Sequence, residues 1–241
     1  MRVMILAAGR GERMRPLTDH TPKPLLAVAG KPLIVWHIER LAAAGLTRLV
    51  INHAHLGQQI EEALGDGGRY GVHIQYSPER PAALETAGGI AHALHLLGDE
   101  VFAVINGDVY CDYDLAQLPA RATALRASHD LAHLVLVNNP PHHPQGDFHL
   151  QQGRLLPTDD QRLATDDSKL TFSGIGLYKP ALFAHLDRNA AAPLAPLLRK
   201  QIVQGQASGE HHQGVWVDVG TPQRLHELDI LLRAQHNTTH V

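Results

Sequence analysis

The sequence has few features that would cross-link the chain or attach it to another macromolecule. Its 241 residues include 1 cysteine, which excludes a disulfide framework and a cysteine-based zinc site. The 21 Lys and Arg residues nearly balance the 24 Asp and Glu residues, which leaves no general basic field for nucleic acid and no polybasic membrane patch. No apolar run reaches the roughly 18 residues of a membrane span, and the apolar start is too short for a signal peptide. We therefore expect a cytoplasmic protein whose partner is a small anion.

The cysteine and the histidines give no strong indication of a metal site. Cys111 is interpreted as a small buried residue rather than as a nucleophile. The 18 histidines include adjacent pairs at 142–143 and 211–212. Neighbouring side chains on a strand point to opposite faces, so such a pair is a poor chelate. We interpret the histidines as surface or packing residues.

The part of the chain that indicates chemistry is residues 1–24. Residues 3–8 form an apolar run bounded by glycine, which predicts a buried strand in a mostly parallel sheet. Gly9 and Gly11 allow a sharp turn whose backbone N–H groups could form an anion-binding nest. Four cationic residues surround this turn: Arg10, Arg13, Arg15 and Lys23. Guanidinium forks and a compact ammonium group suit a polyphosphate, although a plain turn with solvated arginines is the alternative. The pattern lacks the third glycine of the dinucleotide fingerprint and the Gly-Lys-Ser/Thr of a P-loop.

The order of apolar runs and helical periodicities predicts the fold. Strand-like runs are present at 49–51, 74–76, 101–105, 134–137 and 171–178, and within 214–222. Helix-like segments are present at 32–45, 56–64, 86–97, 112–126, 194–205 and 222–232. The βαβαβ alternation predicts an α/β fold with a Rossmann-like, doubly wound, mixed and mostly parallel sheet flanked by helices. Ligands bind such sheets beyond the carboxyl ends of the strands. We expect one domain over residues 1–236 and a disordered tail at 237–241.

Two carboxylates have positions that suggest binding. Asp108 follows the apolar run 101–105, so it lies at the carboxyl end of a central strand and is suited to Mg²⁺, unless it only stabilises a tight turn. Asp147 stands beside a glycine in Gly-Asp-Phe and could hold sugar hydroxyls. The acidic stretch at 155–168 is expected to be a solvated surface turn.

The N-terminal segment resembles the signature of the sugar-phosphate nucleotidyltransferases, which make nucleoside-diphosphate sugars. The matching string is Gly9-x-Gly11-x-Arg13-Met14-x-Pro16-Leu17-Thr18, followed by Pro22-Lys23-Pro24. The resemblance implies that the loop wraps a nucleoside triphosphate, that Arg13 holds phosphates and that Lys23 contacts the phosphate at the reacting centre. Within the loop, the residues expected around the nucleotide are Ala8, Gly9, Gly11 and Glu12.

Three further segments match the family's pattern. The helix start at 86–89 resembles the base-recognition segment, so Thr86 is expected to cap the helix and Gly88 to admit the base. The upstream polar residue that reads the base is Glu79 or Arg80. The strand-Gly-Asp segment and the Trp-x-Asp-x-Gly-Thr segment imply that Asp108 and Asp218 bind Mg²⁺ as the cofactor. The remaining position expected at the sugar, besides Asp147, is Asn106.

One family motif is missing from this chain. Many members carry Glu-Lys-Pro before the strand at 171–178, and its lysine helps to hold the sugar phosphate. No such triplet is present, and Lys169 is the nearest substitute.

The compact length and four short segments look most like the family members that use UTP and N-acetyl-α-muramate 1-phosphate. These segments are 146–148, 172–175, 195–199 and 208–211. The expected products are UDP-N-acetylmuramate and pyrophosphate, in peptidoglycan recycling. The alternatives are a mannose- or glucose-1-phosphate enzyme that uses GTP or dTTP, and a nucleotide-sugar-binding regulatory protein without catalysis. We expect a monomer or a small homo-oligomer.

Overall fold

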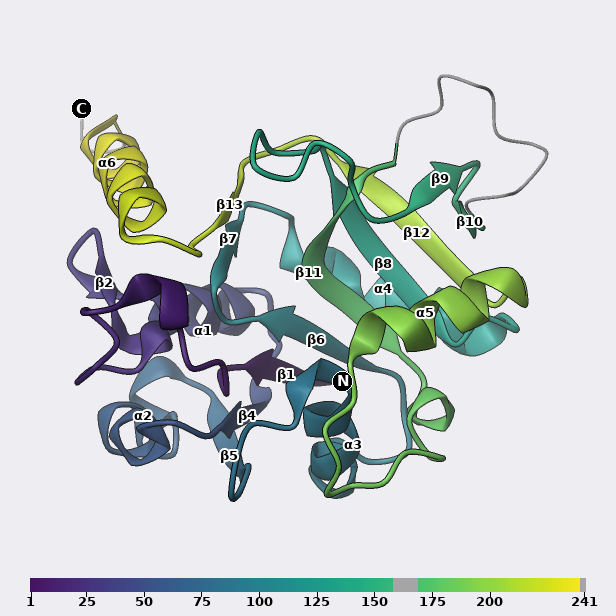
Figure 1. Cartoon of the computed structure of the whole chain (residues 1–241), viewed down its shortest axis with the longest axis horizontal. Helices are drawn as coiled ribbons and strands as arrows, with labels where there is room; N and C mark the ends of the chain where they lie inside the picture. Colours follow the sequence, from purple (N-terminus) through teal and green to yellow (C-terminus); the bar gives the residue numbers. More distant parts are fainter. Residues whose placement is uncertain (158–168, 239–241) are drawn as a thin grey trace.

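The computed structural model describes residues 1–157 and 169–238, without the side chains of 236–238. Its centre is a nine-stranded sheet (Figure 1). The strands, in spatial order, are β5 (His73–Pro78), β4 (Arg48–His53), β1 (Arg2–Leu6), β6 (Phe102–Asn106), β11 (Thr171–Tyr178), β8 (Ala132–Val137), β12 (Ala207–His212), β10 (Arg154–Leu156) and β9 (His149–Gln151). The acidic turn expected at 155–168 falls largely on residues 158–168, which lie outside the described residues.

The sheet is mixed, as the sequence predicts. Strands β5, β4, β1 and β6 are parallel, β11 is antiparallel to both of its neighbours, and β8 and β12 are parallel again. Because β1 lies between β4 and β6, the carboxyl ends of these three parallel strands meet at one edge. The loop after β1 therefore opens onto the crevice where a ligand is expected.

Alternating residues of the strands fill two separate layers of core, one on each face of the sheet. Val3 and Ile5 pack with α1 (Leu33–Ala43), α2 (Gly57–Leu64) and α4 (Leu118–Ala127). Met4, between them, packs on the opposite face with α3 (Glu85–Leu97) and α5 (Leu194–Val203). The two-residue period of a strand produces this division, and helices consequently cover both faces (Figure 1).

A third apolar cluster joins the end of the chain to its beginning. Helix α6 (Pro222–Thr238) contributes Leu228 and Leu232, which pack with Met14 and Trp36. The short pair β2 (Ala27–Val28) and β3 (Lys31–Pro32) lies against this helix, and β7 (Val109–Cys111) pairs with β13 (Trp216–Asp218). Short 3₁₀ helices cover Glu12–Met14, Lys23–Leu25, Gly68–Tyr70, Leu115–Gln117 and Pro180–Leu182. The C-terminal segment is thereby held beside the loop after β1.

Three local predictions differ from the structure. Helix α3 begins at Glu85, so Thr86 lies inside the first turn and caps nothing; no side chain caps this end. Within 112–126 the α-helix starts only at Leu118, where Pro119 suits a first turn. Helix α6 continues to Thr238, so the first 2 residues of the expected tail are helical. Residues 239–241 lie outside the described residues.

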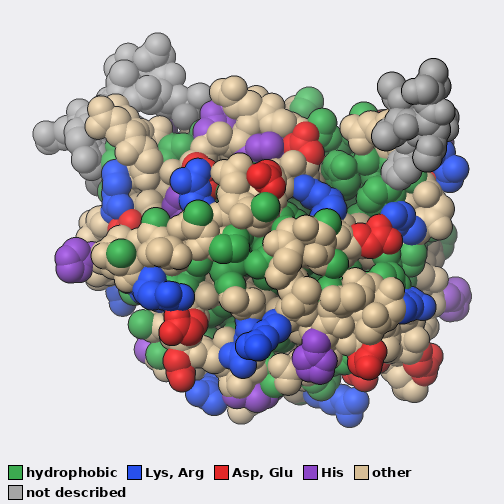
Figure 2. All heavy atoms as spheres, turned by 180° about the vertical axis from the view of Figure 1, so that it is seen from behind, with side chains coloured by type: hydrophobic (Ala, Val, Ile, Leu, Met, Phe, Trp, Pro, Cys, Tyr) green, Lys and Arg blue, Asp and Glu red, His purple; other side chains and the backbone are tan. Residues whose placement is uncertain are grey.

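The surface carries charges of both signs. On the face seen in Figure 2, Lys and Arg side chains are interspersed with Asp and Glu side chains, and hydrophobic side chains reach the surface between them. Among the described helices, none is both long and apolar enough to cross a membrane.

Candidate active site

A chain of buried hydrogen bonds fixes the ends of neighbouring strands at the crevice. The backbone N–H of Ala7 donates to Asn52 Oδ1 at 2.9 Å, and Asn52 Nδ2 donates to Glu79 Oε1 at 2.6 Å. The backbone N–H of Leu84 donates to Glu79 Oε2 at 2.6 Å. Glu79 is only 2% exposed, and such a buried carboxylate needs these donors. The loop after β1, the end of β4 and the start of α3 are therefore held in one arrangement.

Two glycines let the strands approach closely at this edge. A Cβ atom on Gly107 would lie 2.6 Å from the Leu6 carbonyl oxygen, which accepts the Gly107 N–H at 2.9 Å. Gly174, with φ +83°, lies where the register of β11 shifts, and a Cβ atom there would lie 2.8 Å from the Asn106 side chain. Only glycine fits at both points, so β1, β6 and β11 converge where the polar side chains are gathered.

Two adjoining cavities occupy this edge of the sheet. The first, which we call the inner cavity, has a volume of about 210 Å³. The predicted residues that line it are Ala8, Gly9, Lys23, Glu79, Thr86, Asn106 and Asp108. The second, which we call the loop cavity, is lined by Gly9, Gly11, Glu12, Arg13, Lys23 and Asp108, with Gly220. The structure therefore brings most of the residues predicted at the nucleotide to two connected spaces.

Lys23 and Asp108 line both cavities and form an ion pair. Lys23 Nζ lies 2.6 Å from Asp108 Oδ2. The lysine side chain is 9% exposed, whereas the aspartate side chain is 42% exposed. The ammonium group is consequently held in one place by a buried stem, and the carboxylate offers its other oxygen to the cavities.

Asp218 lies on the strand that pairs with β7, but it lines neither the inner cavity nor the loop cavity. In the β7–β13 ladder it lies opposite Val109, the residue after Asp108. Its Oδ2 atom lies 3.0 Å from Arg224 Nη1 and 3.5 Å from His142 Nε2. The two predicted metal carboxylates are thus neighbours in the fold, and each is paired with a cation in this structure.

A third cavity, which we call the outer cavity, has a volume of about 420 Å³. It shares Glu85, Thr86 and Asn106 with the inner cavity. Asp147, predicted at the sugar, lines it, but both of its oxygens already have partners. Oδ2 accepts the Phe172 N–H at 2.8 Å, and Oδ1 lies 3.1 Å from His143 Nε2. Asp147 therefore also fixes the start of β11.

Several predicted residues have other surroundings than expected. Gly88 lines none of these cavities; a Cβ atom there would lie 2.5 Å from the Ala190 carbonyl oxygen, so this glycine permits close packing of two backbones. Arg80 is exposed and does not line the inner cavity, whereas Glu79 does. Around the loop, Arg15 pairs with Asp19 at 2.7 Å and Arg10 with Glu12 at 3.4 Å, so neither lines the loop cavity.

Sequence reasoning missed four residues of the site. Asn52 links the loop to Glu79, and its position at the end of a predicted strand was the available signal. Arg224 pairs with Asp218, and Glu85 and Arg199 line the outer cavity. Glu85 has φ +57°, a strained conformation for a residue other than glycine, which no sequence pattern reveals.

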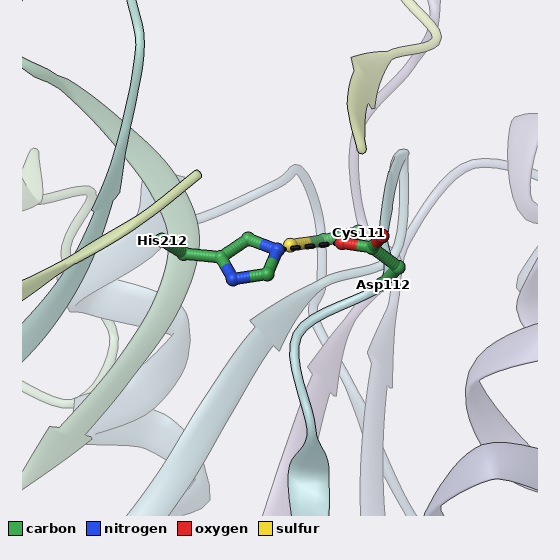
Figure 3. A group of neighbouring side chains, drawn as sticks. All are labelled: Cys111, Asp112 and His212. Carbon is green, nitrogen blue, oxygen red and sulfur yellow. Dashed lines mark hydrogen bonds and ion pairs between the residues drawn. The ribbon is translucent and has the colours of Figure 1, made fainter. Parts of the chain in front are cut away.

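A separate cluster joins Cys111, Asp112 and His212 (Figure 3), at the ends of β7 and β12. Their ligand atoms lie within 4.8 Å of one another. His212 Nε2 already lies 2.6 Å from Asp112 Oδ1, and burial raises the pKa of the Cys111 thiol to about 11. A metal ion would have to break that hydrogen bond and deprotonate a buried thiol, so we interpret the cluster as packing. This agrees with the expectation that Cys111 is buried.

Comparison with known proteins identifies the class to which this site belongs. The family model described as "Nucleotidyl transferase" matches residues 2–235. The chain belongs to this family, which confirms the resemblance seen in its sequence, and the chain is an enzyme of that kind. A related protein of Neisseria meningitidis serogroup B is 56% identical over 235 residues, which are 97% of this chain and 99% of the relative. It bears the name N-acetylmuramate alpha-1-phosphate uridylyltransferase.

A more distant relative carries the same name. The protein of Caulobacter vibrioides is 35% identical over 226 residues, covering 91% of this chain and 92% of the relative. A crystal structure from Bacillus anthracis, assigned as a glucose-1-phosphate thymidylyltransferase in complex with a sucrose, superposes with a TM-score of 0.83. It is 23% identical, and the match covers 97% of this chain and 95% of that one. That likeness concerns the fold alone, and it confirms the predicted Rossmann-like class.

Proposed function

We propose that this enzyme transfers the uridylyl group of UTP to N-acetyl-α-muramate 1-phosphate and releases pyrophosphate. The observation that carries the proposal is the 56% identity, across 97% of the chain, to a relative named for that reaction. The product would be UDP-N-acetylmuramate. Because N-acetylmuramate is a peptidoglycan sugar, we assign the reaction to the recycling of the cell wall.

The reaction needs no general base. A phosphate monoester has its second pKa near ~6, so the attacking oxygen of the sugar phosphate is already anionic at neutral pH. It displaces pyrophosphate in line at the α-phosphorus of UTP. Positioning and the offset of negative charge must therefore supply the rate acceleration.

The residues around the inner and loop cavities fit these two tasks. We assign Lys23, whose ammonium group is held by a buried stem, to the α-phosphate. Arg13 and the backbone N–H groups of the glycine turn would bind the leaving pyrophosphate. The base would lie in the inner cavity near Thr86, with Glu79 and Asn52 fixing the surrounding backbone.

The two carboxylates suit Mg²⁺ as a bound cofactor. Mg²⁺ prefers oxygen ligands and takes one or two carboxylates, leaving its other positions to phosphates and water. Asp108 offers a partly exposed carboxylate to both cavities, and Asp218 is its neighbour across the β7–β13 ladder. When bound, the ion would neutralise charge on the nucleotide phosphates. We assign Asp108 and Asp218 to its binding, with Arg224 and Lys23 as the cations that neutralise them without it.

Pyrophosphate release tests the proposal directly. UTP, GTP and dTTP are each combined with the 1-phosphates of N-acetylmuramate, N-acetylglucosamine, mannose and glucose. We expect the highest kcat/KM for UTP with N-acetyl-α-muramate 1-phosphate. A higher kcat/KM for mannose 1-phosphate with GTP would assign the enzyme to a different reaction. Nucleotide-sugar binding without turnover in any pair would assign it to regulation.

A further inference from the structure

The outer cavity contains charged side chains that the assigned reaction does not use. Glu85, Asp147 and Arg199 all line it. Asp147 has partners on both carboxylate oxygens. Within the described part of the chain, Glu85 and Arg199 make no hydrogen bond or ion pair. One anion and one cation therefore face this cavity without partners.

These two charges lie at different ends of the outer cavity. Glu85 also lines the inner cavity, so it marks the boundary toward the nucleotide. Arg199 also lines a further cavity with Lys169, so it marks the opposite boundary. Asp147 lines the same two cavities, but both of its oxygens have partners, so the charge left unpaired at this end is that of Arg199. An anionic substituent of a bound sugar would be repelled from the nucleotide end and attracted to the end that holds Arg199.

Arg199 is placed on a helix that otherwise supports the core. Its neighbours in α5, Leu197 and Leu198, are buried against the sheet, and the cavity wall beside Arg199 is apolar, with Leu194 and Phe172. An ion pair near an apolar wall is less screened by water than one on the open surface. The guanidinium group can also bind a carboxylate with two parallel hydrogen bonds.

We propose that Arg199 binds the carboxylate of the sugar substrate and so selects acidic sugar 1-phosphates over neutral ones. This inference rests on the proposed function, since N-acetylmuramate is N-acetylglucosamine that carries a lactyl ether with a carboxylate. The reducing-end phosphate would lie at Lys23 and Asp108, and the lactyl group would extend through the outer cavity to α5.

The test compares two substrates that differ only in the lactyl group. For Arg199→Ala we expect kcat/KM for N-acetylmuramate 1-phosphate to fall about 10- to 100-fold, the range for one hydrogen-bonded charge. We expect wild type to use N-acetylglucosamine 1-phosphate only weakly, and this activity should change by no more than about twofold in Arg199→Ala. Arg199→Lys keeps the charge and loses the guanidinium fork, so its kcat/KM for N-acetylmuramate 1-phosphate should lie between those of wild type and Arg199→Ala. Lys200→Ala, at the next exposed position of α5, is the matched control and should behave as wild type.

A matching change on the substrate turns this comparison into a double-mutant cycle. When the substrate carboxylate is converted to a neutral amide, kcat/KM of wild type should fall about as far as it falls in Arg199→Ala with the acidic substrate. The same change of substrate should lower kcat/KM of Arg199→Ala little further. Equal losses for acidic and neutral sugars in Arg199→Ala would overturn the inference and make Arg199 a structural residue. If wild type itself does not prefer N-acetylmuramate 1-phosphate, the proposed function fails instead, so the two failures are distinguishable.

Discussion

The inner and loop cavities together form the inner half of the cleft, and the outer cavity forms its outer half. The two halves differ in how their charged side chains are held. In the inner half, the side chain of Lys23 is 9% exposed and paired with Asp108, and Glu79 has partners on both oxygens. In the outer half, Arg199 faces the cavity without a partner among the described residues, as does Glu85, which lies at the boundary and lines both cavities. Lys23, which we assign to the phosphate chemistry, is thus fixed before a ligand arrives, whereas Arg199 is left to pair with a ligand. Arg13 at the loop cavity also has no partner among the described residues, so the contrast concerns Lys23 and Glu79 on one side and Arg199 on the other.

This difference predicts different results of mutation. A change in the inner half should lower turnover with every sugar 1-phosphate, because all of them use the same phosphate chemistry. A change in the outer half should alter the choice between sugars and leave the chemistry intact. The predictions below test that division, beginning with the largest effect.

Removal of the two carboxylates that we assign to Mg²⁺ should have the largest effect. Asp108→Asn and Asp218→Asn should each lower kcat about 1,000-fold, because the charge that the ion neutralises is worth several kcal/mol, and ~4 kcal/mol corresponds to that factor. If the two aspartates act as one unit, the double variant should be little worse than the poorer single variant. The measurement is turnover across a Mg²⁺ titration, for acidic and neutral sugar 1-phosphates.

Asp112→Asn is the control for these variants. Asp108 directly precedes β7 and Asp112 directly follows it, but Asp112 pairs with His212 and lines neither the inner nor the loop cavity. Its turnover should be close to that of wild type. Near-normal turnover of Asp218→Asn at moderate Mg²⁺ would remove that residue from the metal site. Fully multiplicative losses in the double variant would indicate two separate roles.

Loss of the ammonium group should be the next largest effect. Lys23→Ala should lower kcat about 100-fold, as expected when one preorganised charge is removed from a transition state, and should raise KM for UTP much less. The loss should be the same for every sugar 1-phosphate. Lys31→Ala, which breaks an ion pair with Glu39 away from the cavities, is the control. A change confined to KM would assign Lys23 to ground-state binding of the nucleotide.

The sequence predicts the inner half of the cleft better than the outer half. The βαβ periodicity and the glycine turn place Gly9, Lys23 and Asp108 at one edge of the sheet, and the structure brings them to the same cavities. Gly9 and Asp108 come at the ends of predicted strands, so their location depends on topology. Lys23 is expected there because it stands in the family's signature after the glycine turn. Their chemical roles remain predictions.

The outer half depends on packing that a pattern of residue types does not contain. Arg199 lies on a helix whose orientation over the sheet is set by the core, and the positive φ of Glu85 follows from the way α3 begins. The roles of Thr86 and Gly88 were predicted from their order in a motif. In the structure Thr86 caps nothing, and Gly88 allows two backbone segments to pack closely. Tertiary contacts decided these positions.

Two glycines allow stability and binding to be separated. A Cβ atom on Gly88 would meet backbone atoms of Ala190 and Ala192, so Gly88→Ala should lower the free energy of unfolding by about 1–3 kcal/mol. A Cβ atom on Gly9 would meet nothing within 4 Å, so Gly9→Ala should unfold as wild type does but raise KM for UTP roughly tenfold, or ~1.4 kcal/mol. Urea unfolding and kinetics on both variants measure this. A Gly88→Ala protein of normal stability with weak UTP binding would return Gly88 to the nucleotide site.

The smallest expected effect concerns Glu210. This residue shows that the contrast between paired and unpaired charges holds only for residues that line the cavities. Glu210 lies in β12, in the same part of the sheet as the outer cavity, yet its carboxylate accepts hydrogen bonds from Tyr113 and Arg121. Burial alone would raise its pKa, but hydrogen bonds from His133, Tyr113 and Arg121 outweigh burial and lower the pKa from 4.5 to about 2. The ionised carboxylate therefore stabilises the fold at pH above about 4.5, and this contribution is lost as the pH falls toward about 2. Glu210→Gln should cost about 1 kcal/mol at pH 7, and the difference from wild type should shrink below pH 4.5. Urea unfolding at a series of pH values measures the difference, and a constant difference across that range would mean that the charge of Glu210 does not stabilise the fold.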